Sequence, residues 1–339
     1  MSYQKFFNAF REKNRLNASV LLLFIALVIV LSLSRGSVEL SSEEIVKAFL
    51  RQGDTTNQII FWELRLPRLI ASLLVGSALG MSGALLQGML RNGLASPYLL
   101  GISAGSGLVI VLLISMGLWL SWIPIAAWIG AIFTTLIVYC LAKSGTSISV
   151  ERLILAGVAL SSLFGSIQSM LLLQTEDGRV QAALTWLIGS LNSRGWTEIK
   201  LAALPIVFAL VVGLLLSRQL NLLGLGDELS VGLGNSLFRS RCLIGASATL
   251  LAASSVSVGG LIGFVGLIVP HAARFLFGSD YRVVLPFSAL LGAFTLSAAD
   301  LIARSGTIEL PVGIITSLLG APIFIVLLYK RQKSLTSLR

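Results

Sequence analysis

The stretch RLIASLLVGSALGMSGALLQGML, residues 68–90, decides the class of fold. After Arg68 it contains no charged side chain before Arg91, and about 20 apolar residues are enough for an α-helix to cross the hydrocarbon core of a bilayer. Gly76 and Gly80 are four residues apart, a spacing of small residues that lets membrane helices approach closely. These residues therefore predict a transmembrane helix that packs closely against its neighbours.

The composition of the whole chain also indicates a membrane protein. Of the 339 residues, 55% are hydrophobic and 12% are charged, whereas an average soluble domain carries about 25% charged residues. Glycine is abundant, at 33 residues, and the four-residue spacing recurs at Gly101 and Gly105 and at Gly259 and Gly263. The net charge of +10 comes from short basic segments between apolar stretches. This distribution argues against nucleic-acid binding, which needs basic residues clustered on one soluble face.

Apolar runs between charged or turn-rich segments predict an all-α polytopic membrane protein with about ten transmembrane helices, so that residues 1–339 form a single transmembrane domain. The predicted spans are residues 18–34, 68–90, 98–117, 122–142, 151–173, 199–217, 240–258, 260–270, 284–304 and 311–329. The segment 260–270 is too short to cross alone, is rich in glycine and ends at Pro270. Such a segment is tolerated only where protein buries it or where it lines a cavity, so we expect it inside the bundle. Short outer helices are predicted over 39–52 and 180–191.

The N-terminal segment is similar to a signal peptide, because basic residues precede an apolar run from Val20 to Leu33. That run approaches the length of a full span, and Ser32-Leu33-Ser34 is a poor cleavage site. Many further spans also follow. We therefore expect the segment to be retained as the first transmembrane helix.

The distribution of charge orients the predicted spans. With the N-terminus in the cytoplasm, the inner segments hold 16 of the 25 basic residues, while the outer segments hold nine acidic residues against five inside. Basic residues near the ends of spans favour the cytoplasmic side. Ten spans therefore place both termini in the cytoplasm, and moving one span would reverse every later segment.

No catalytic residue, metal site or cofactor is predicted. An active site needs a nucleophile, an acid–base pair or a metal cluster close together, and the only histidine is His271, expected to cap or hydrogen-bond at a helix break. Cys140 and Cys242 have neither metal-ligand nor disulfide spacing. Neither Lys143-Ser144 nor Lys333-Ser334 follows the glycines of a Walker-type phosphate loop. We therefore expect that the chain is not an enzyme and does not itself hydrolyse ATP by that route.

Asp300 is the one acidic residue within a predicted span, where charged groups are costly and are usually paired. Arg304 lies four residues further on, on the same face of a helix. A structural Asp300–Arg304 pair near the outer end of the span is the simplest interpretation. A proton relay would need a chain of such residues, and its absence from the sequence argues against a proton-coupled pump.

The segment QLNLLGLGDELSVGLGNS, residues 219–236, is too polar to span the membrane and lies on the predicted cytoplasmic side. It breaks at Gly224 and Gly226, and Asp227 and Glu228 then stand at a predicted helix start, where acidic side chains stabilise the helix. The pattern predicts two short helices joined by a glycine turn. A docking element for a cytoplasmic partner and a plain loop are both compatible with it.

On the predicted outer side, Arg65 and Arg68 precede the second span and face the same way if the segment is helical. Their long side chains could snorkel to the interface and do no more. Alternatively, the two arginines could dock an acidic partner.

Four stretches together carry a resemblance to a known family. They are RLPRLIASLLVGSALGMSGALLQGMLRNGLASPYLLGISAGS (65–106), LGDELSVGLG (225–234), GGLIGFVGLIVPHAARFLFGSDYR (259–282) and ADLIAR…ELPVGIITSLLGAPIF (299–324). They extend from the second predicted span to the last, so nearly the whole chain is covered. In combination they resemble the FecCD family of ABC importer permeases, which serve ferric siderophores, haem and cobalamin.

The resemblance implies a permease of ten spans in the cytoplasmic (inner) membrane of a bacterium, in contact with membrane lipid. It would work with a second permease chain, as a homodimer or a related heterodimer. Two copies of a cytoplasmic ATP-binding subunit would bind at the segment 219–236, with coupling residues Leu225, Gly226, Asp227, Glu228 and Gly234. The acidic lobes of an extracytoplasmic substrate-binding protein would dock at Arg65, Arg68 and Arg304.

The substrate follows only from the resemblance. The stretch LTWLIGSLNSRGW, residues 184–196, is most similar to ferric-citrate and other siderophore permeases, so a ferric siderophore is the expected substrate. The alternatives are a cobalamin or haem importer permease of the same family, or an ion-coupled secondary transporter. A polytopic membrane enzyme would need acids or histidines clustered at one depth, which this sequence does not supply.

Overall fold

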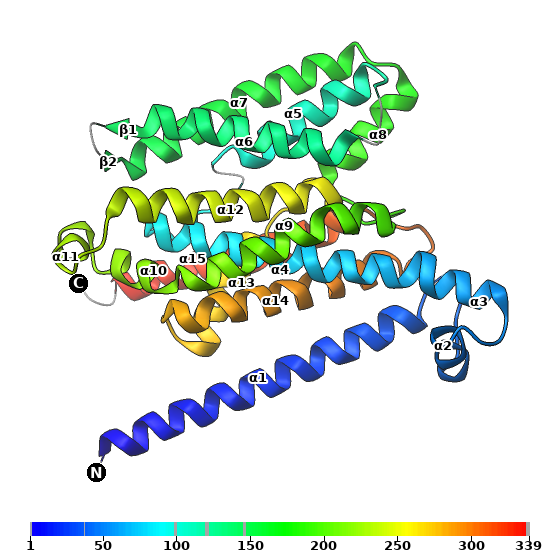
Figure 1. Ribbon diagram of the computed structural model, residues 1–339, viewed down its shortest axis with the longest axis horizontal. Helices are drawn as coiled ribbons and strands as arrows, with labels where there is room; N and C mark the ends of the chain where they lie inside the picture. The colour runs from blue at the N-terminus through cyan, green and yellow to red at the C-terminus, as the bar shows by residue number, and fades with distance from the viewer. Residues whose placement is uncertain (1, 37, 98–99, 119–121, 145–146, 337–339) are drawn as a thin grey trace.

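The computed structural model describes residues 2–36, 38–97, 100–118, 122–144 and 147–336 (Figure 1). Nearly all of this part of the chain is helical, as the all-α prediction requires. The helices are α1 (Ser2–Ser34), α2 (Ser42–Phe49), α3 (Thr55–Ile59), η1 (Ile60–Arg65), α4 (Leu66–Leu90), α5 (Ile102–Ser115), α6 (Ile123–Ala142), α7 (Val150–Leu173), α8 (Asp177–Ile188), α9 (Trp196–Leu215), α10 (Ser217–Gly224), α11 (Asp227–Gly232), α12 (Leu237–Gly259), α13 (Val265–Phe277), α14 (Tyr281–Ala303) and α15 (Val312–Thr336). Two strands, β1 (Lys143–Ser144) and β2 (Ser147–Ile148), pair antiparallel.

Among the described residues, seven helices are long and apolar enough to cross a membrane. Three shorter apolar helices lie at Ile102–Ser115, Val265–Phe277 and Val312–Val326. An apolar helix therefore stands at the place of each predicted span, although residues 98–99 of the third lie outside the described residues. How many of these helices cross the bilayer, and on which side the termini lie, stay predictions.

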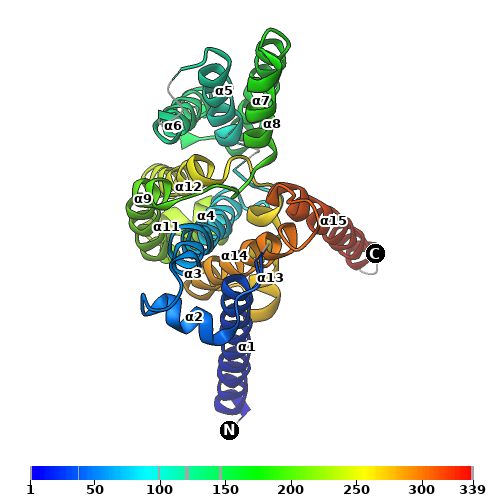
Figure 2. The ribbon, with the colours of Figure 1, turned by 90° about the vertical axis from the view of Figure 1, so that its right-hand side faces the viewer.

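Helix α4 forms the centre of the molecule and is surrounded by α9, α12, α13 and α14 (Figure 2). Glycine permits the closest of these contacts. A Cβ atom on Gly76 would lie 2.3 Å from the carbonyl oxygen of Gly292, and one on Gly83 would lie 1.8 Å from that of Gly266. Close packing through the small residues of α4 is thus confirmed. At Gly263, by contrast, the nearest atom to an added Cβ is 3.8 Å away, so the Gly259…Gly263 spacing makes no tight helix contact there.

The remaining helices extend this centre in three directions. Helices α5 to α8 form a separate group on one side, with a small apolar core around Ile110, Ile123 and Ala183 (Figure 2). Helix α1 runs along α14, where the rings of Phe24 and Phe294 are 6.0 Å apart. Helix α15 stands out from the body on a third side.

The predicted end of the eighth span is wrong. Residues 260–264 are not helical, and α13 begins at Val265 and continues through Pro270 to Phe277. A proline inside a helix removes one N–H donor and leaves the carbonyl four residues earlier without its usual partner. The side-chain amide of Gln87 on α4 donates to that turn. Its Nε2 atom lies 3.1 Å from the carbonyl oxygen of Leu267 and 3.5 Å from that of Gly266. His271 consequently lies within the helix rather than at a break, with Nδ1 3.1 Å from the Leu267 oxygen.

The two ends of the molecule carry different elements (Figure 1). The first turns of α1, the last turns of α15, the pair α10–α11 and the two strands lie toward one end. Helices α2 and α3 lie at the other end. The predicted outer helix over 39–52 corresponds to α2, and the one over 180–191 corresponds to α8.

Candidate functional site

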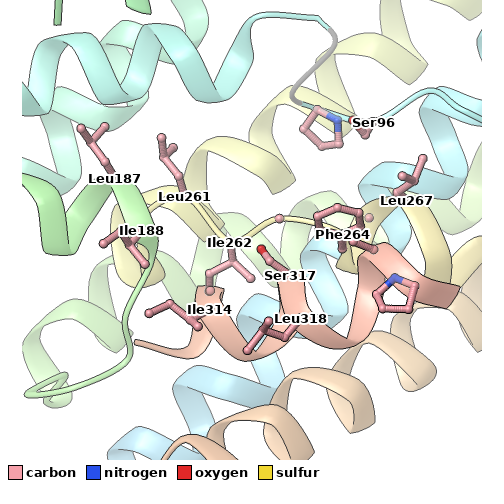
Figure 3. A pocket seen from close by; sticks show the side chains of 16 residues that line it. Ser96, Leu187, Ile188, Leu261, Ile262, Phe264, Leu267, Ile314, Ser317 and Leu318 are labelled. Atoms are coloured by element: carbon pink, nitrogen blue, oxygen red, sulfur yellow. The ribbon is translucent and has the colours of Figure 1, made fainter. Parts of the chain in front are cut away.

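The described part of the chain contains a cavity of about 820 Å³ beside α15 (Figure 3). Its wall combines the loop after α4, the end of α8, the non-helical segment 260–264 with the first turn of α13, and one face of α15. Most of this wall is apolar, and the hydroxyl groups of Ser96 and Ser317 are polar exceptions. The short glycine-rich segment, which the sequence analysis expected inside the bundle, thus lines part of this cavity.

Phe264, in the wall of this cavity, has an unusual main-chain conformation. Its φ angle is 64°, a left-handed conformation that side chains other than glycine rarely adopt and that costs about 1–3 kcal/mol. A Cβ atom on Gly320 of α15 would lie 2.5 Å from the Cβ of Phe264, so α15 approaches Phe264 closely only because residue 320 is glycine. Strain of this kind concentrates at functional sites, and no sequence pattern indicated it.

At the end that carries α2 and α3, a cluster of charged side chains surrounds Asp300. The guanidinium of Arg68 binds both oxygens of the Asp300 carboxylate, with Nε 3.0 Å from each and Nη2 2.8 Å from Oδ1. Arg304 Nε lies 3.6 Å from Asp300 Oδ2, and Arg68 also pairs with Glu309. The predicted Asp300–Arg304 pair is therefore present, but the shorter contacts of Asp300 are to Arg68 on α4, which sequence reasoning missed.

Arg65, which the resemblance placed on the outer surface, is buried in the structure. It donates to the main-chain oxygens of Leu33, Ser34 and Val38, so its side chain holds the end of α1 and the turn that follows. A basic side chain is favourable there, because the last carbonyl groups of a helix have no partner within it. Arg304 Nη2 reaches the same region and donates to the oxygen of Ser32. The three arginines thus gather at one end, each held by groups of this chain.

At the opposite end, the segment 219–236 forms the two predicted short helices. Helix α10 ends at Gly224, Gly226 adopts a φ of 104°, and α11 begins at Asp227. Only glycine adopts that φ readily, so the turn between the helices depends on Gly226. Gly234 also has a positive φ, of 81°, where the chain leaves α11.

Asp227 has a second role besides opening α11. Its carboxylate accepts two hydrogen bonds from Arg241 Nη2, at 2.9 and 3.0 Å, and pairs with Arg91 at 3.1 Å. The Arg241 side chain is only 3% exposed and also donates to the oxygen of Ile148. Asp227 therefore fastens α11 to α12 and to the turn after α4, whereas Glu228 is exposed.

The surface formed by α11 and by the turns on either side of it, the first of which ends α10, carries exposed apolar side chains. Leu225, Leu229, Val231 and Leu233 are all more than half exposed, and Phe238 of α12 is nearly so. An exposed apolar patch of this kind marks an interaction site in many proteins. Sequence reasoning named Leu225 and missed the others, although apolar residues inside a polar, glycine-broken segment are a signal that could have revealed them.

These features define a class of protein: a multi-pass membrane transport permease, consistent with a chain that is not itself an enzyme. The model of the FecCD transport family matches residues 22–330. The chain belongs to that family.

Relatives and one solved structure agree over most of the chain. A probable siderophore transport system permease protein of Bacillus subtilis is 36% identical over 326 residues, covering 93% of this chain and 94% of the relative. A cobalamin import system permease protein of Halobacterium salinarum is 41% identical over 283 residues, covering 82% and 75%. An inward-facing structure described as a metal-chelate type ABC transporter superposes with a TM-score of 0.84 at 33% identity, covering 91% of this chain and 97% of that chain.

Proposed function

We propose that the chain is the permease subunit of an ATP-driven importer that moves an iron(III)–siderophore chelate across the cytoplasmic membrane of a bacterium. The membership in the FecCD transport family carries this proposal, and the siderophore permease from Bacillus subtilis supports the substrate class. The chain would act beside a second permease chain, identical or related. It would require no cofactor of its own.

The exposed apolar surface of α10 and α11 is the proposed docking site for two cytoplasmic ATP-binding subunits, one on each permease chain. Leu225, Leu229 and Val231 supply apolar area, and Glu228 supplies an exposed charge beside them. Gly226 and Gly234 give the turns that present this surface. Asp227 contributes by holding α11 in place through Arg241.

The outer arginine cluster is the proposed docking site for a substrate-binding protein with acidic lobes. Arg68 is the residue best placed for this role, because its partner Glu309 lies on the loop before α15 and is 35% exposed. Arg65 and Arg304 would act mainly by supporting the site, since their guanidinium groups bind main-chain oxygens of α1 and the turn after it.

The cavity beside α15 is the proposed part of the substrate pathway that this chain contributes. Its volume of about 820 Å³ lies within the range of small-molecule sites, about 300–1,000 Å³. Its largely apolar wall offers few strong interactions, which suits a pathway that must release its substrate.

Uptake by reconstituted vesicles tests the proposal. The permease is assembled with its ATP-binding subunit and binding protein, and accumulation of ferric siderophore, haem and cobalamin is compared with and without ATP. ATP-dependent uptake of the ferric siderophore is expected. Preference for cobalamin would favour the alternative supported by the Halobacterium salinarum relative. Uptake driven by an ion gradient without any ATP-binding subunit would instead establish a secondary transporter.

A further inference from the structure

The strongest unexplained feature inside the bundle is the buried amide of Gln87 at the turn of α13 that Pro270 interrupts. Pro270 has no N–H group, so the Gly266 oxygen lacks its usual helical partner. The side-chain amide of Gln87 lies 3.5 Å from that oxygen and 3.1 Å from the oxygen of Leu267. Gln87 is only 3% exposed, and a buried amide is costly unless it is hydrogen-bonded. Helix α4 thus supplies a hydrogen bond at the turn where α13 cannot complete its own.

The side-chain oxygen of Gln87 also has a hydrogen-bond partner on α13. Arg274, on the last turn of α13, donates to Gln87 Oε1 and lies next to the side chain of Tyr281 at the start of α14. Gln87 therefore lies between two turns of α13 and bonds to both. Its two bonds fix α13 against α4, and Arg274 lies between Gln87 and the first residue of α14.

From Tyr281, hydrogen bonds lead to helix α10. The Tyr281 main-chain N–H donates to Asn221 Oδ1 at 3.0 Å, and Asn221 Nδ2 donates to Asp280 Oδ1 at 2.7 Å. Asn221 lies on α10, directly beside the apolar surface described above. Burial opposes the ionisation of Asp280, but the N–H of Arg282 and the amide of Asn221 outweigh it and lower the pKa of Asp280, so the carboxylate that accepts from Asn221 is charged at neutral pH.

Close packing leaves these helices little room to slide independently. A Cβ atom on Gly88 of α4 would lie 2.6 Å from the side chain of Leu220 and 2.8 Å from the ring of Tyr281. Gly83, one turn away from Gln87, meets the main chain at Gly266. Gly266 and Leu267 in turn line the cavity, next to the strained residue Phe264.

We propose that Gln87 and Arg274 are positioning residues that transmit displacement of α10 to the cavity-lining first turn of α13. The proposal rests on the proposed function, in which an ATP-binding subunit moves α10. Two hydrogen bonds on one side chain suit this role, because one joins α4 to the last turn of α13 and the other joins α4 to the first turn, where Pro270 removes a helical hydrogen bond. Neither residue touches the substrate in this proposal.

The test measures substrate moved per ATP hydrolysed in reconstituted complexes. The variant Gln87→Leu removes both hydrogen bonds, whereas Gln87→Glu keeps an acceptor for Arg274 and removes the donor to α13. Both variants are expected to assemble with the ATP-binding subunit and to hydrolyse ATP, but to move about tenfold less substrate per ATP, within the usual range of coupling energies. The matched control is Gln168→Leu on α7, which removes a similarly buried amide that donates to the oxygen of Ala104 at 2.9 Å and should leave the ratio unchanged.

A double variant distinguishes a positioning role of Gln87 from a contribution to the stability of the fold alone. Adding Pro270→Ala to Gln87→Leu restores an N–H that can satisfy the Gly266 oxygen within α13. Thermal stability is expected to recover while the substrate-to-ATP ratio stays low. Recovery of both would overturn the positioning role, and so would a wild-type ratio in Gln87→Leu itself. Failure of the wild-type permease to bind any ATP-binding subunit would instead reject the proposed function on which this inference rests.

Discussion

The two ends of the molecule use charge in opposite ways. At the end that carries α2 and α3, the Asp300 carboxylate is 3% exposed and lies between Arg68 and Arg304, so these charges are largely removed from solvent and paired within the chain. At the end that carries α10 and α11, Asp227 fastens the helix while Leu229 and its apolar neighbours stay uncovered. The Asp300 cluster is buried and pairs its charges within the chain, although Arg304 Nε has no hydrogen bond, whereas the apolar surface around α11 is open to solvent. Charged residues around Asp300 therefore stabilise the fold, whereas the exposed apolar residues around α11 form the surface that we propose as a binding site.

The sharpest way to break this comparison is to show that the two ends do not face opposite sides of the membrane. In a chain whose Cys140 and Cys242 are replaced by alanine, single cysteines are introduced by Ser42→Cys in α2 and Ser236→Cys before α12. Both serines are exposed, and Ser42 is preferred to Ser41 because the Ser41 side chain caps α2. An impermeant thiol reagent is expected to label the first site only from outside and the second only from inside. Labelling of both sites from one side would contradict the ten-span topology.

The largest energetic effect is expected at Asp300. Replacing it by alanine leaves Arg68 and Arg304 without their shared carboxylate, and removing one partner of a buried ion pair costs about 3–5 kcal/mol. The thermal unfolding of the detergent-solubilised protein should show this loss. The control is Lys47→Ala, which removes a solvent-exposed pair with Glu43 on α2 and should leave thermal stability almost unchanged. Similar stability of the two variants would mean that the outer cluster is hydrated rather than closed.

An intermediate effect is expected on the apolar surface of α11. Leu229 is 63% exposed, so Leu229→Asp should leave the fold intact while burying a charge in the proposed interface. A central interface residue contributes about 2 kcal/mol or more, so binding of the ATP-binding subunit should weaken by at least tenfold in a pull-down titration. The matched control, Leu50→Asp at the end of α2, introduces the same charge at another exposed leucine, far from this surface. Unchanged binding by the Leu229 variant would remove α11 from the docking site. Asp227→Lys is less informative, because it also leaves the buried Arg241 guanidinium without its carboxylate partner.

The smallest effect is expected at Glu309. The Glu309 carboxylate forms an ion pair with Arg68. An acidic docking partner would therefore have to displace Glu309 in order to bind Arg68. Exposed ion pairs contribute about 0–1 kcal/mol, and charges at the rim of an interface act mainly on the association rate. Glu309→Gln should therefore speed capture of the binding protein by about two- to threefold at low salt, with the gain disappearing at high salt. Slower capture would mean that Glu309 assists docking instead of competing with it.

Local patterns predicted the parts of the molecule in which neighbouring residues decide the outcome. The turn between α10 and α11 was predictable because Gly224, Gly226 and the acidic pair that opens α11 lie within five residues of one another. The end of α13 was not predictable. Proline usually disrupts a helix interior, but α13 continues through Pro270. Gln87, 183 positions earlier in the chain, donates a hydrogen bond at the turn that Pro270 interrupts.

The sequence by itself determined that the chain is a helical membrane protein, which family it resembles and where most apolar helices lie, because these properties depend on composition and on the spacing of residues along a single helix. Only the tertiary structure decided that Arg68 is joined to Asp300 across 232 positions, that Arg65 holds the end of α1, and that Gln87 bridges α4 and α13. A buried charge or amide must find a partner somewhere, but sequence spacing does not say which one. That choice is made when glycine-lined helices pack closely enough to bring distant side chains within hydrogen-bonding distance.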